Sequence, residues 1–225
     1  MREDTRMGWG AARCGESRLA HGWRLEAASG LPEDLVTGMV IPALRSVPST
    51  IARRLKPCRI RLVERLDDPA EASRWVESAA ALEVSVACEG VEAHDVALEV
   101  LLCVGQALWE TLRPAESAAY LVLLSQEIVD SVTGEIDEEA LYKKRRLMAG
   151  HASARSRRRL EEYARASFAG TAAEYVHCLW HDVTVREGPD HLPPRCLRRR
   201  LELLARWFPP NRGYRLFAAR PRRAS

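Results

Sequence analysis

The sequence predicts an α+β protein that is mostly α-helical, with a small sheet followed by a buried central helix and further helices. Two short segments, at residues 58–66 and 82–88, alternate apolar and polar side chains, which is typical of half-buried strands. From residue 92 onward the apolar residues recur with the period of a helix. Of the 225 residues, 47% are hydrophobic and 29% are charged, and this composition excludes a wholly disordered protein.

Three segments are predicted along the chain. Residues 1–30 are rich in Gly, Arg and Ser without periodicity, so we expect a disordered leader, or residues upstream of the true start. Residues 31–217 are expected to form a single domain, and residues 218–225 a loose basic tail.

Prolines and alternating segments organise the first part of the domain. A proline is favoured in the first turn of a helix, whereas a later proline interrupts the helix. The elements predicted before residue 91 are therefore a helix from Leu31-Pro32 that is interrupted near Pro42 or Pro48, a strand at 58–66, a short helical stretch at 71–76, and an edge strand at 82–88.

The central helix is predicted at residues 92–113. Its polar residues form one narrow stripe on an otherwise apolar cylinder, which indicates a largely buried helix. The stripe consists of Glu92, Asp95, Glu99, Gln106, Glu110 and Arg113. Proline and glycine positions, with Asp137 as an N-cap, then predict helices at 115–131, 137–148, 155–182 and 195–207.

Charge is distributed unevenly along the chain. Residues 61–140 contain 18 acidic and 4 basic side chains, residues 141–165 contain 2 and 9, and residues 194–225 contain 1 and 10. One interpretation is that the acidic and basic segments form solvent-exposed faces of one domain. The functional alternative is that the basic segments bind an anionic partner.

Cysteines and apolar runs limit the classes of protein that fit. The six cysteines form no CxxC pair, so zinc-knuckle and redox spacings are absent from the sequence. The N-terminus has no apolar signal region, and we therefore expect reduced thiols and a cytoplasmic location. The longest nearly apolar run, Val96–Trp109, has 14 residues, whereas a membrane span needs about 20.

One segment of the central helix resembles a known signature. Residues 101–110 read Leu-Leu-Cys-Val-Gly-Gln-Ala-Leu-Trp-Glu. They are similar to the H-E-x-G-H-A-L-W helix of zincin metallopeptidases in their small, gluzincin-like form, which implies a zincin-like fold over residues 31–185. In this overlay Leu102 takes the place of the first histidine, Cys103 that of the glutamate and Gln106 that of the second histidine. Zinc hydrolysis needs two imidazoles and a carboxylate at these positions, and none is present.

A second segment resembles a later helix of the same family. Residues 165–175 are similar to the gluzincin pattern E-D-F-A-E-x-F-A-x-Y, and the third zinc ligand falls at Ala166. The resemblance therefore implies a catalytically inactive protein that holds no zinc on the central helix. We expect it to bind a protein or peptide partner through the former active-site groove, between the central helix and the strand at 82–88.

A non-standard metal site is one alternative. Glu174, His177 and His181 have helical spacing that places them on one face, and another helix can supply His94 or Cys103 as a further ligand. In the competing interpretation, the two histidines only form hydrogen bonds with neighbouring side chains. Cys103 and Cys178 are expected to be inert because burial raises the pKa of a thiol.

Binding of nucleic acid or another polyanion is the other alternative. Clusters of Arg and Lys attract phosphate, although the sequence contains no recognised nucleic-acid motif. A second cluster, around residues 195–200, has the same two interpretations. The first cluster consists of Lys143, Lys144, Arg145, Arg146, Arg155, Arg157, Arg158 and Arg159.

Overall fold

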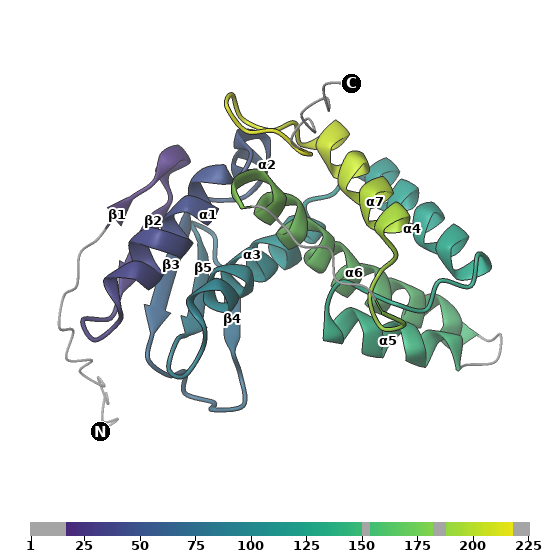
Figure 1. The fold of residues 1–225 in the computed structure, drawn as a ribbon, viewed down its shortest axis with the longest axis horizontal. Coiled ribbons are helices and arrows are strands. Elements are labelled where there is room, and N and C mark those ends of the chain that lie inside the picture. Colours follow the sequence, from purple (N-terminus) through teal and green to yellow (C-terminus); the bar gives the residue numbers. More distant parts are fainter. Residues whose placement is uncertain (1–16, 150–153, 182–187, 218–225) are drawn as a thin grey trace, which may run out of the picture.

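The computed structural model describes residues 17–149, 154–181 and 188–217. These residues form a mixed α/β structure in which a small five-stranded sheet lies at one end and a group of helices at the other (Figure 1). The predicted mixed and mostly helical class is therefore confirmed. No helix among these residues is long and apolar enough to cross a membrane.

The sheet has the strand order β1-β2-β3-β5-β4. Its three middle strands are parallel, and each outer strand runs antiparallel to its neighbour. The strands are β1 (Ser17–Arg18), β2 (Arg24–Ala27), β3 (Cys58–Val63), β4 (Ser73–Glu77) and β5 (Leu82–Ala87).

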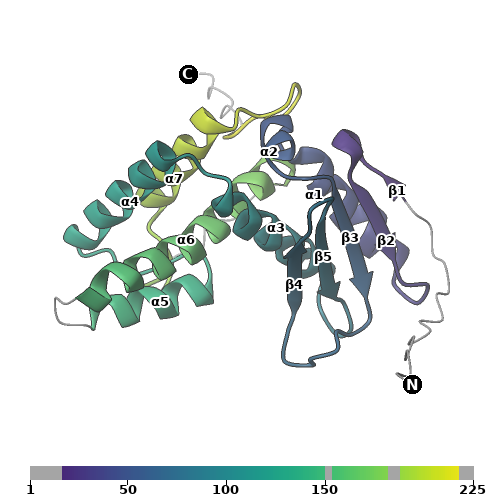
Figure 2. The same cartoon turned by 180° about the vertical axis from the view of Figure 1, so that it is seen from behind.

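Only one face of the sheet is buried. Ile60 of β3 and Val84 of β5 are adjacent in the register and have no exposed surface, whereas the alternate residues Arg59 and Arg61 are exposed. Figure 2 shows the other face of the sheet in front of the helices that cover the buried face. The alternation predicted from the sequence is therefore confirmed in both strands.

Three short helical segments lie between β2 and β3. They are the π-helical segment η2 (Asp34–Val40) and the α-helices α1 (Ile41–Ser46) and α2 (Ser49–Arg54). The helical path continues through Pro42, which lies in the first turn of α1, and is interrupted at Pro48. Of the two interruptions considered, the one at Pro48 is confirmed.

Three expectations for the sheet were wrong or incomplete. Residues before position 31 take part in the fold, because β1 and β2 belong to the sheet and Trp23 and Leu25 are buried. The stretch at 71–76 forms the strand β4 instead of a helix, since Trp75 packs inward between two exposed residues. The strand at 82–88 is internal, and β4 is the edge strand.

The later helices match the predicted order. They are α3 (Ala93–Glu110), α4 (Pro114–Val129), α5 (Glu138–Met148), α6 (Ala154–Trp180) and α7 (Pro194–Trp207). The largest interface between helices joins α3 to α6 at Gly105, where an added Cβ atom would lie 2.7 Å from the carbonyl oxygen of Ala169. A side chain at this position would push the two helices apart, so glycine sets how closely they approach.

Candidate functional site

The edge strand β4 and the central helix α3 form the first candidate site. The Ser73 hydroxyl donates a hydrogen bond of 2.9 Å to the carboxylate of Glu99, which joins the start of β4 to α3. Cys103, one turn further along α3, also faces Ser73 and is buried. These contacts fix one side of α3 against the edge of the sheet.

Leu102 and Gln106 lie on the side of α3 between this edge strand and α6. Successive residues of an α-helix are about 100° apart around its axis. Gly105 faces α6 and Glu99 faces β4, and on this helical wheel Leu102 and Gln106 lie between those two positions. Both side chains are half-buried. The positions that the family resemblance assigns to zinc-binding histidines therefore lie between the two elements that flank α3.

The other two positions of the resemblance are buried. Burial raises the pKa of the Cys103 thiol to about 11, and the hydrogen bond from Ser73 only partly opposes this rise. Ala166 lies on α6 and is 4% exposed. Neither position offers a group that activates water, because a neutral thiol and a methyl group take no part in proton transfer at neutral pH.

The outer edge of β4 carries backbone groups that pair with no strand in the described part of the chain. Hydrogen bonds of 2.9 Å run from Ala87 N to Ala72 O and from Ser78 N to Ala81 O, so the even-numbered residues of β4 face β5. The N–H and C=O groups of Ser73, Trp75 and Glu77 consequently point away from the sheet. Among the described strands, β4 pairs with β5 alone.

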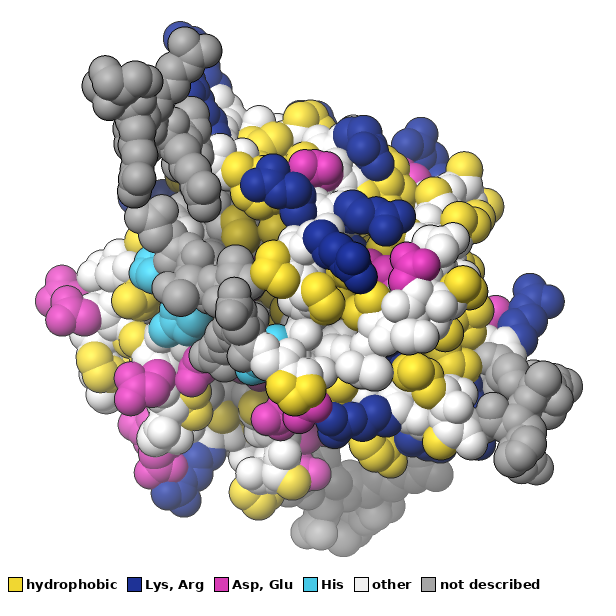
Figure 3. Space-filling view, turned by 45° about the vertical axis from the view of Figure 1, so that its right-hand side comes forward, with side chains coloured by type: hydrophobic (Ala, Val, Ile, Leu, Met, Phe, Trp, Pro, Cys, Tyr) yellow, Lys and Arg dark blue, Asp and Glu magenta, His cyan; other side chains and the backbone are white. Residues whose placement is uncertain are grey.

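A second candidate site lies where the start of α3 meets the end of α6. Nε2 of His94 lies 3.1 Å from Nε2 of His177, and the ring of His181 stacks on that of His177 with 5.3 Å between centroids. Figure 3 shows histidine side chains gathered on one face of the molecule. The structure thus places Glu174, His177 and His181 together, as the helical spacing predicted, and brings His94 to them from α3.

The cysteine near these histidines is not activated. The pKa of the Cys178 thiol is raised well above its usual value by burial and by the carboxylate of Glu174. A thiol in this environment stays protonated and is a poor nucleophile.

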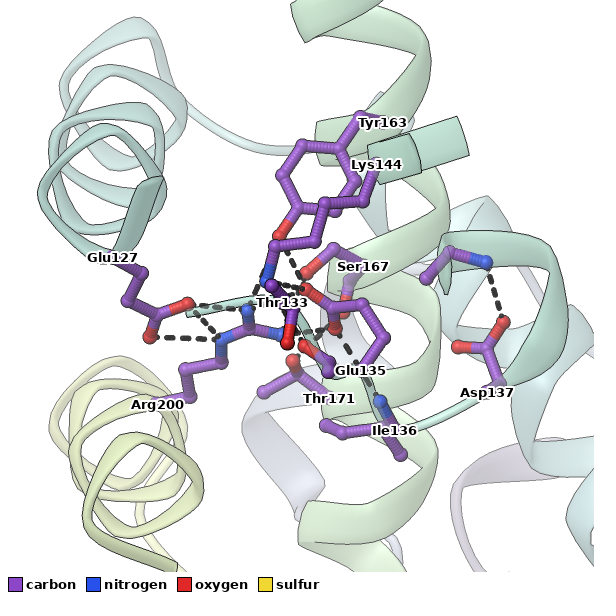
Figure 4. Close-up of polar contacts among 12 residues, drawn as sticks. Glu127, Thr133, Glu135, Ile136, Asp137, Lys144, Tyr163, Ser167, Thr171 and Arg200 are labelled. Carbon is purple, nitrogen blue, oxygen red and sulfur yellow. Dashed lines mark hydrogen bonds and ion pairs between the residues drawn. The ribbon is translucent and has the colours of Figure 1, made fainter. Parts of the chain in front are cut away.

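A buried network of charges lies among the helices α4 to α7 (Figure 4). Arg200 has no exposed surface and forms ion pairs with Glu127 at 2.5 Å and with Glu135 at 2.8 Å. Lys144, which is also fully buried, lies 3.1 Å from Glu135. Two cations and two carboxylates therefore neutralise one another without contact with water.

Hydroxyl groups complete this network. Tyr163 donates a hydrogen bond to Glu135, and Arg200 donates one of 2.7 Å to Ser167. Burial alone would raise the pKa of Glu135, but the charge and hydrogen bonds of Arg200, with the charge of Lys144, lower it to about 2. The network is closed to ligands, so its role is to join four helices.

Arg200 belongs to the basic cluster around residues 195–200, and its burial is not predicted from that cluster. A signal was present, because Arg200 lies on the same helical face as Cys196, Leu203 and Leu204, all of which are buried. An arginine within an apolar stripe needs carboxylate partners, but the spacing within α7 does not identify them.

Most members of the basic cluster are already paired or buried. Lys144 belongs to the buried network and has no surface to offer a polyanion. Lys143, Arg145, Arg157 and Arg158 form ion pairs with Glu139, Asp190, Glu161 and Glu162 respectively. Arg146 lies over the ring of Tyr142, Arg159 donates to the carbonyl of Arg146, and the side chain of Arg155 lies outside the described residues.

Asp137 carries an unusual carboxyl group beside the buried network. One of its oxygens accepts the N-cap hydrogen bond of α5 from Ala140 at 2.9 Å, as predicted. The other is buried with no hydrogen-bond partner among the described residues and faces the backbone of α6 at Gly170. Burial raises the pKa of Asp137 from 3.8 to about 6, against the effect of the N-cap bond.

This pKa predicts a stability change between about pH 4 and pH 6. In that range the folded protein holds a proton on Asp137 that the unfolded chain has lost, so the contribution of this carboxyl to the free energy of unfolding falls as the pH rises, by about 2–3 kcal/mol. Asp137→Asn keeps an N-cap acceptor but removes the charge. The stability of this variant relative to the parent should therefore increase from pH 4 to pH 7, measured by urea unfolding.

The exposed neighbour Glu138 provides the control for this prediction. Glu138→Gln should give a curve of stability against pH that follows the parent across the same range, because an exposed carboxyl is solvated in both states. Parallel curves for Asp137→Asn and the parent would contradict the raised pKa.

Comparisons with protein-family models, curated proteins and solved structures each found no match to this chain.

Proposed function

We propose that this chain is a catalytically inactive, zincin-like protein that binds an extended peptide carrying basic side chains between β4 and α3. The observation that carries the proposal is the outward-facing backbone of β4, which Ser73 joins to α3 at Glu99, on the side of the helix where the half-buried Gln106 lies. The partner is a protein or peptide, and binding needs no cofactor.

Strand addition is the mode of binding that fits β4. An extended segment can pair with the free N–H and C=O groups of Ser73, Trp75 and Glu77, and these main-chain hydrogen bonds supply affinity. Val76 is 55% exposed at this edge, which gives the incoming strand an apolar neighbour. The strand β4 has only one ladder partner among the described strands, so pairing with a peptide displaces nothing described.

The charge of α3 selects the kind of peptide. Glu92, Asp95 and Glu99 lie on the same side of α3 as Gln106, because they are spaced along one stripe. Carboxylates that flank a binding groove attract basic side chains and repel acidic ones. A peptide that alternates basic and apolar residues would direct its charged side chains toward this stripe and its apolar ones away from it.

The absence of catalytic groups supports a binding role over hydrolysis. Leu102 has no atom that ligates zinc, and Cys103 is a buried thiol whose pKa is raised. The matching residues of the signature serve packing instead, since Gly105 permits the close contact with α6 and Ala107 and Leu108 are buried in the core. The residues that match the zincin pattern are therefore packing residues, which is what we expect of an inactive relative.

A peptide library tests this proposal. Peptides of about ten residues that alternate Lys or Arg with Val or Leu should bind, whereas their Glu-containing counterparts should not. Gln106→Lys should weaken binding of the basic peptides at least about tenfold, because it adds a like charge to the groove. The measurements are fluorescence anisotropy of labelled peptides and the amide NMR shifts of Ser73, Trp75 and Glu77.

The matched control is Gln126→Lys, the same substitution at an exposed position of α4. This variant should bind the peptides as the parent does. If the whole library fails to bind, or if Gln106→Lys and Gln126→Lys have equal effects, the groove is not a peptide site.

A further inference from the structure

Three histidines from two helices meet at a point that the proposed peptide groove does not use. His94 lies in the first turn of α3, and His177 and His181 lie at the end of α6. The interface between α3 and α6 holds these ends together, since the two helices cross closely at Gly105. His177 is buried, whereas His94 is about one-third exposed and His181 is exposed, so solvent reaches the cluster from one side.

The separation of two ring nitrogens is close to that in a metal centre. Zinc binds histidine nitrogen at about 2.0–2.1 Å, so two nitrogens on one tetrahedral zinc lie about 3.3 Å apart. Nε2 of His94 and Nε2 of His177 lie 3.1 Å apart. The two nitrogens face each other in a hydrogen bond, and an outward movement of the His94 ring, which is partly exposed, lets an ion take the place of the shared proton.

The remaining ring nitrogens face carboxylates. Nδ1 of His94 lies 3.4 Å from a carboxylate oxygen of Asp95, and Nδ1 of His177 lies 3.5 Å from one of Glu174. Histidines that bind a metal usually donate their other N–H to a carboxylate, carbonyl or water, which fixes the tautomer and the orientation of the ring. Each of the two histidines has such a carboxylate beside it.

We propose that His94, His177 and His181 bind a divalent transition-metal ion such as Zn²⁺. Nε2 of His94 and Nε2 of His177 are the first two ligands, and His181 is the third. Glu174 and Asp95 orient the rings and do not touch the metal, and water fills the open position. Imidazole ligands favour Zn, Cu, Ni and Co over Mg and Ca.

The ring of His181 must turn to complete the site. It lies nearly parallel to that of His177, at 17°, with its centroid 5.9 Å from that of His94. Among the described residues no three ligands already converge at metal distances. The rotation exchanges the ring contacts of His181 with His177 and Trp180 for a bond to the metal ion.

Titration of the full chain, without a polyhistidine tag, tests the proposal. One equivalent of Co²⁺ should produce the visible absorption of a tetrahedral nitrogen site, and Zn²⁺ should displace it. His94→Ala and His181→Ala should each weaken Co²⁺ binding, and Asp95→Asn should weaken it by about 10–100-fold. His177→Ala should abolish binding, with the fold of every variant checked by circular dichroism.

Two controls separate this site from others. His191→Ala removes a histidine whose backbone pairs with Glu135, and Gln106→Ala alters the groove position of the family resemblance; neither should change Co²⁺ binding. If His177→Ala does not fold, the more exposed His94 and His181 variants decide the outcome. No binding at millimolar Co²⁺, or binding unchanged by His94→Ala and His181→Ala, would leave only a hydrogen-bonded histidine pair and overturn the proposal.

The outcome is independent of the peptide proposal. The titration uses metal alone and the peptide assay uses no metal, so each result stands without the other. If the peptides fail to bind while the titration shows one equivalent of bound Co²⁺, the peptide proposal is wrong and the metal proposal stands.

Discussion

Arg200→Ala should destabilise the protein more than any surface substitution, by about 3–5 kcal/mol. The side chain of Arg200 is fully buried and joins Glu127 on α4 to Glu135 in the segment before α5. Its removal leaves Glu127 as a buried carboxylate without its partner, because both of its oxygens accept from this guanidinium. The free energy of unfolding, from urea denaturation at pH 7, measures the loss.

Arg198 provides the matched control in the same helix. Its side chain is 60% exposed and lies 3.7 Å from Glu202, so Arg198→Ala should change stability by less than about 1 kcal/mol. The double variant Glu127→Gln with Arg200→Met should recover part of the loss of Arg200→Met alone, since it removes the stranded charge. Equal effects of Arg198→Ala and Arg200→Ala would show that the buried network contributes nothing to stability.

The buried network also shows where prediction from the sequence ends. Helix α7 and its apolar face follow from the periodicity of residues 195–207. The ion-pair partners of Arg200, however, are Glu127 and Glu135, which are 73 and 65 residues away. Helical periodicity specifies neighbours within a few residues, whereas the meeting of α4 with α7 depends on the packing of the whole domain.

The sheet shows the same limit in another form. The strands β3 and β5 were predicted because each has several buried residues at alternate positions. The strand β4 has one inward-packing residue, Trp75, and gains its strand structure from pairing with β5. Which strand lies at the edge of the sheet is a property of this pairing, and so the alternation of residues 82–88 could not show that β5 is internal.

For each candidate site, the sequence predicts the residues that one helix contributes. The stripe on α3 and the shared face of Glu174, His177 and His181 follow from helical spacing. The facing groups, Ser73 for the stripe and His94 for the histidines, come from other elements. The sequence offers both His94 and Cys103 as further ligands, and the antiparallel contact of α3 with α6 is what places His94 beside His177.

Gly105→Ala should destabilise the protein, by about 1–3 kcal/mol, although alanine is the better helix former. The new Cβ atom would lie 2.7 Å from the carbonyl oxygen and 2.9 Å from Cα of Ala169, and backbone atoms in the middle of α6 cannot move aside alone. Helices α3 and α6 must therefore separate. The control is Gly38→Ala in η2, where an added Cβ atom meets nothing within 4 Å and stability should rise or stay unchanged.

The same substitution reaches both candidate sites because α3 is common to them. When α3 moves away from α6, His94 moves away from His177, so Gly105→Ala should weaken Co²⁺ binding as well as stability. The Gly38→Ala variant should leave Co²⁺ binding unchanged. If Gly105→Ala were as stable as the parent and bound Co²⁺ equally well, the close contact at Ala169 would not hold these helices, and Gly105 would have no packing role.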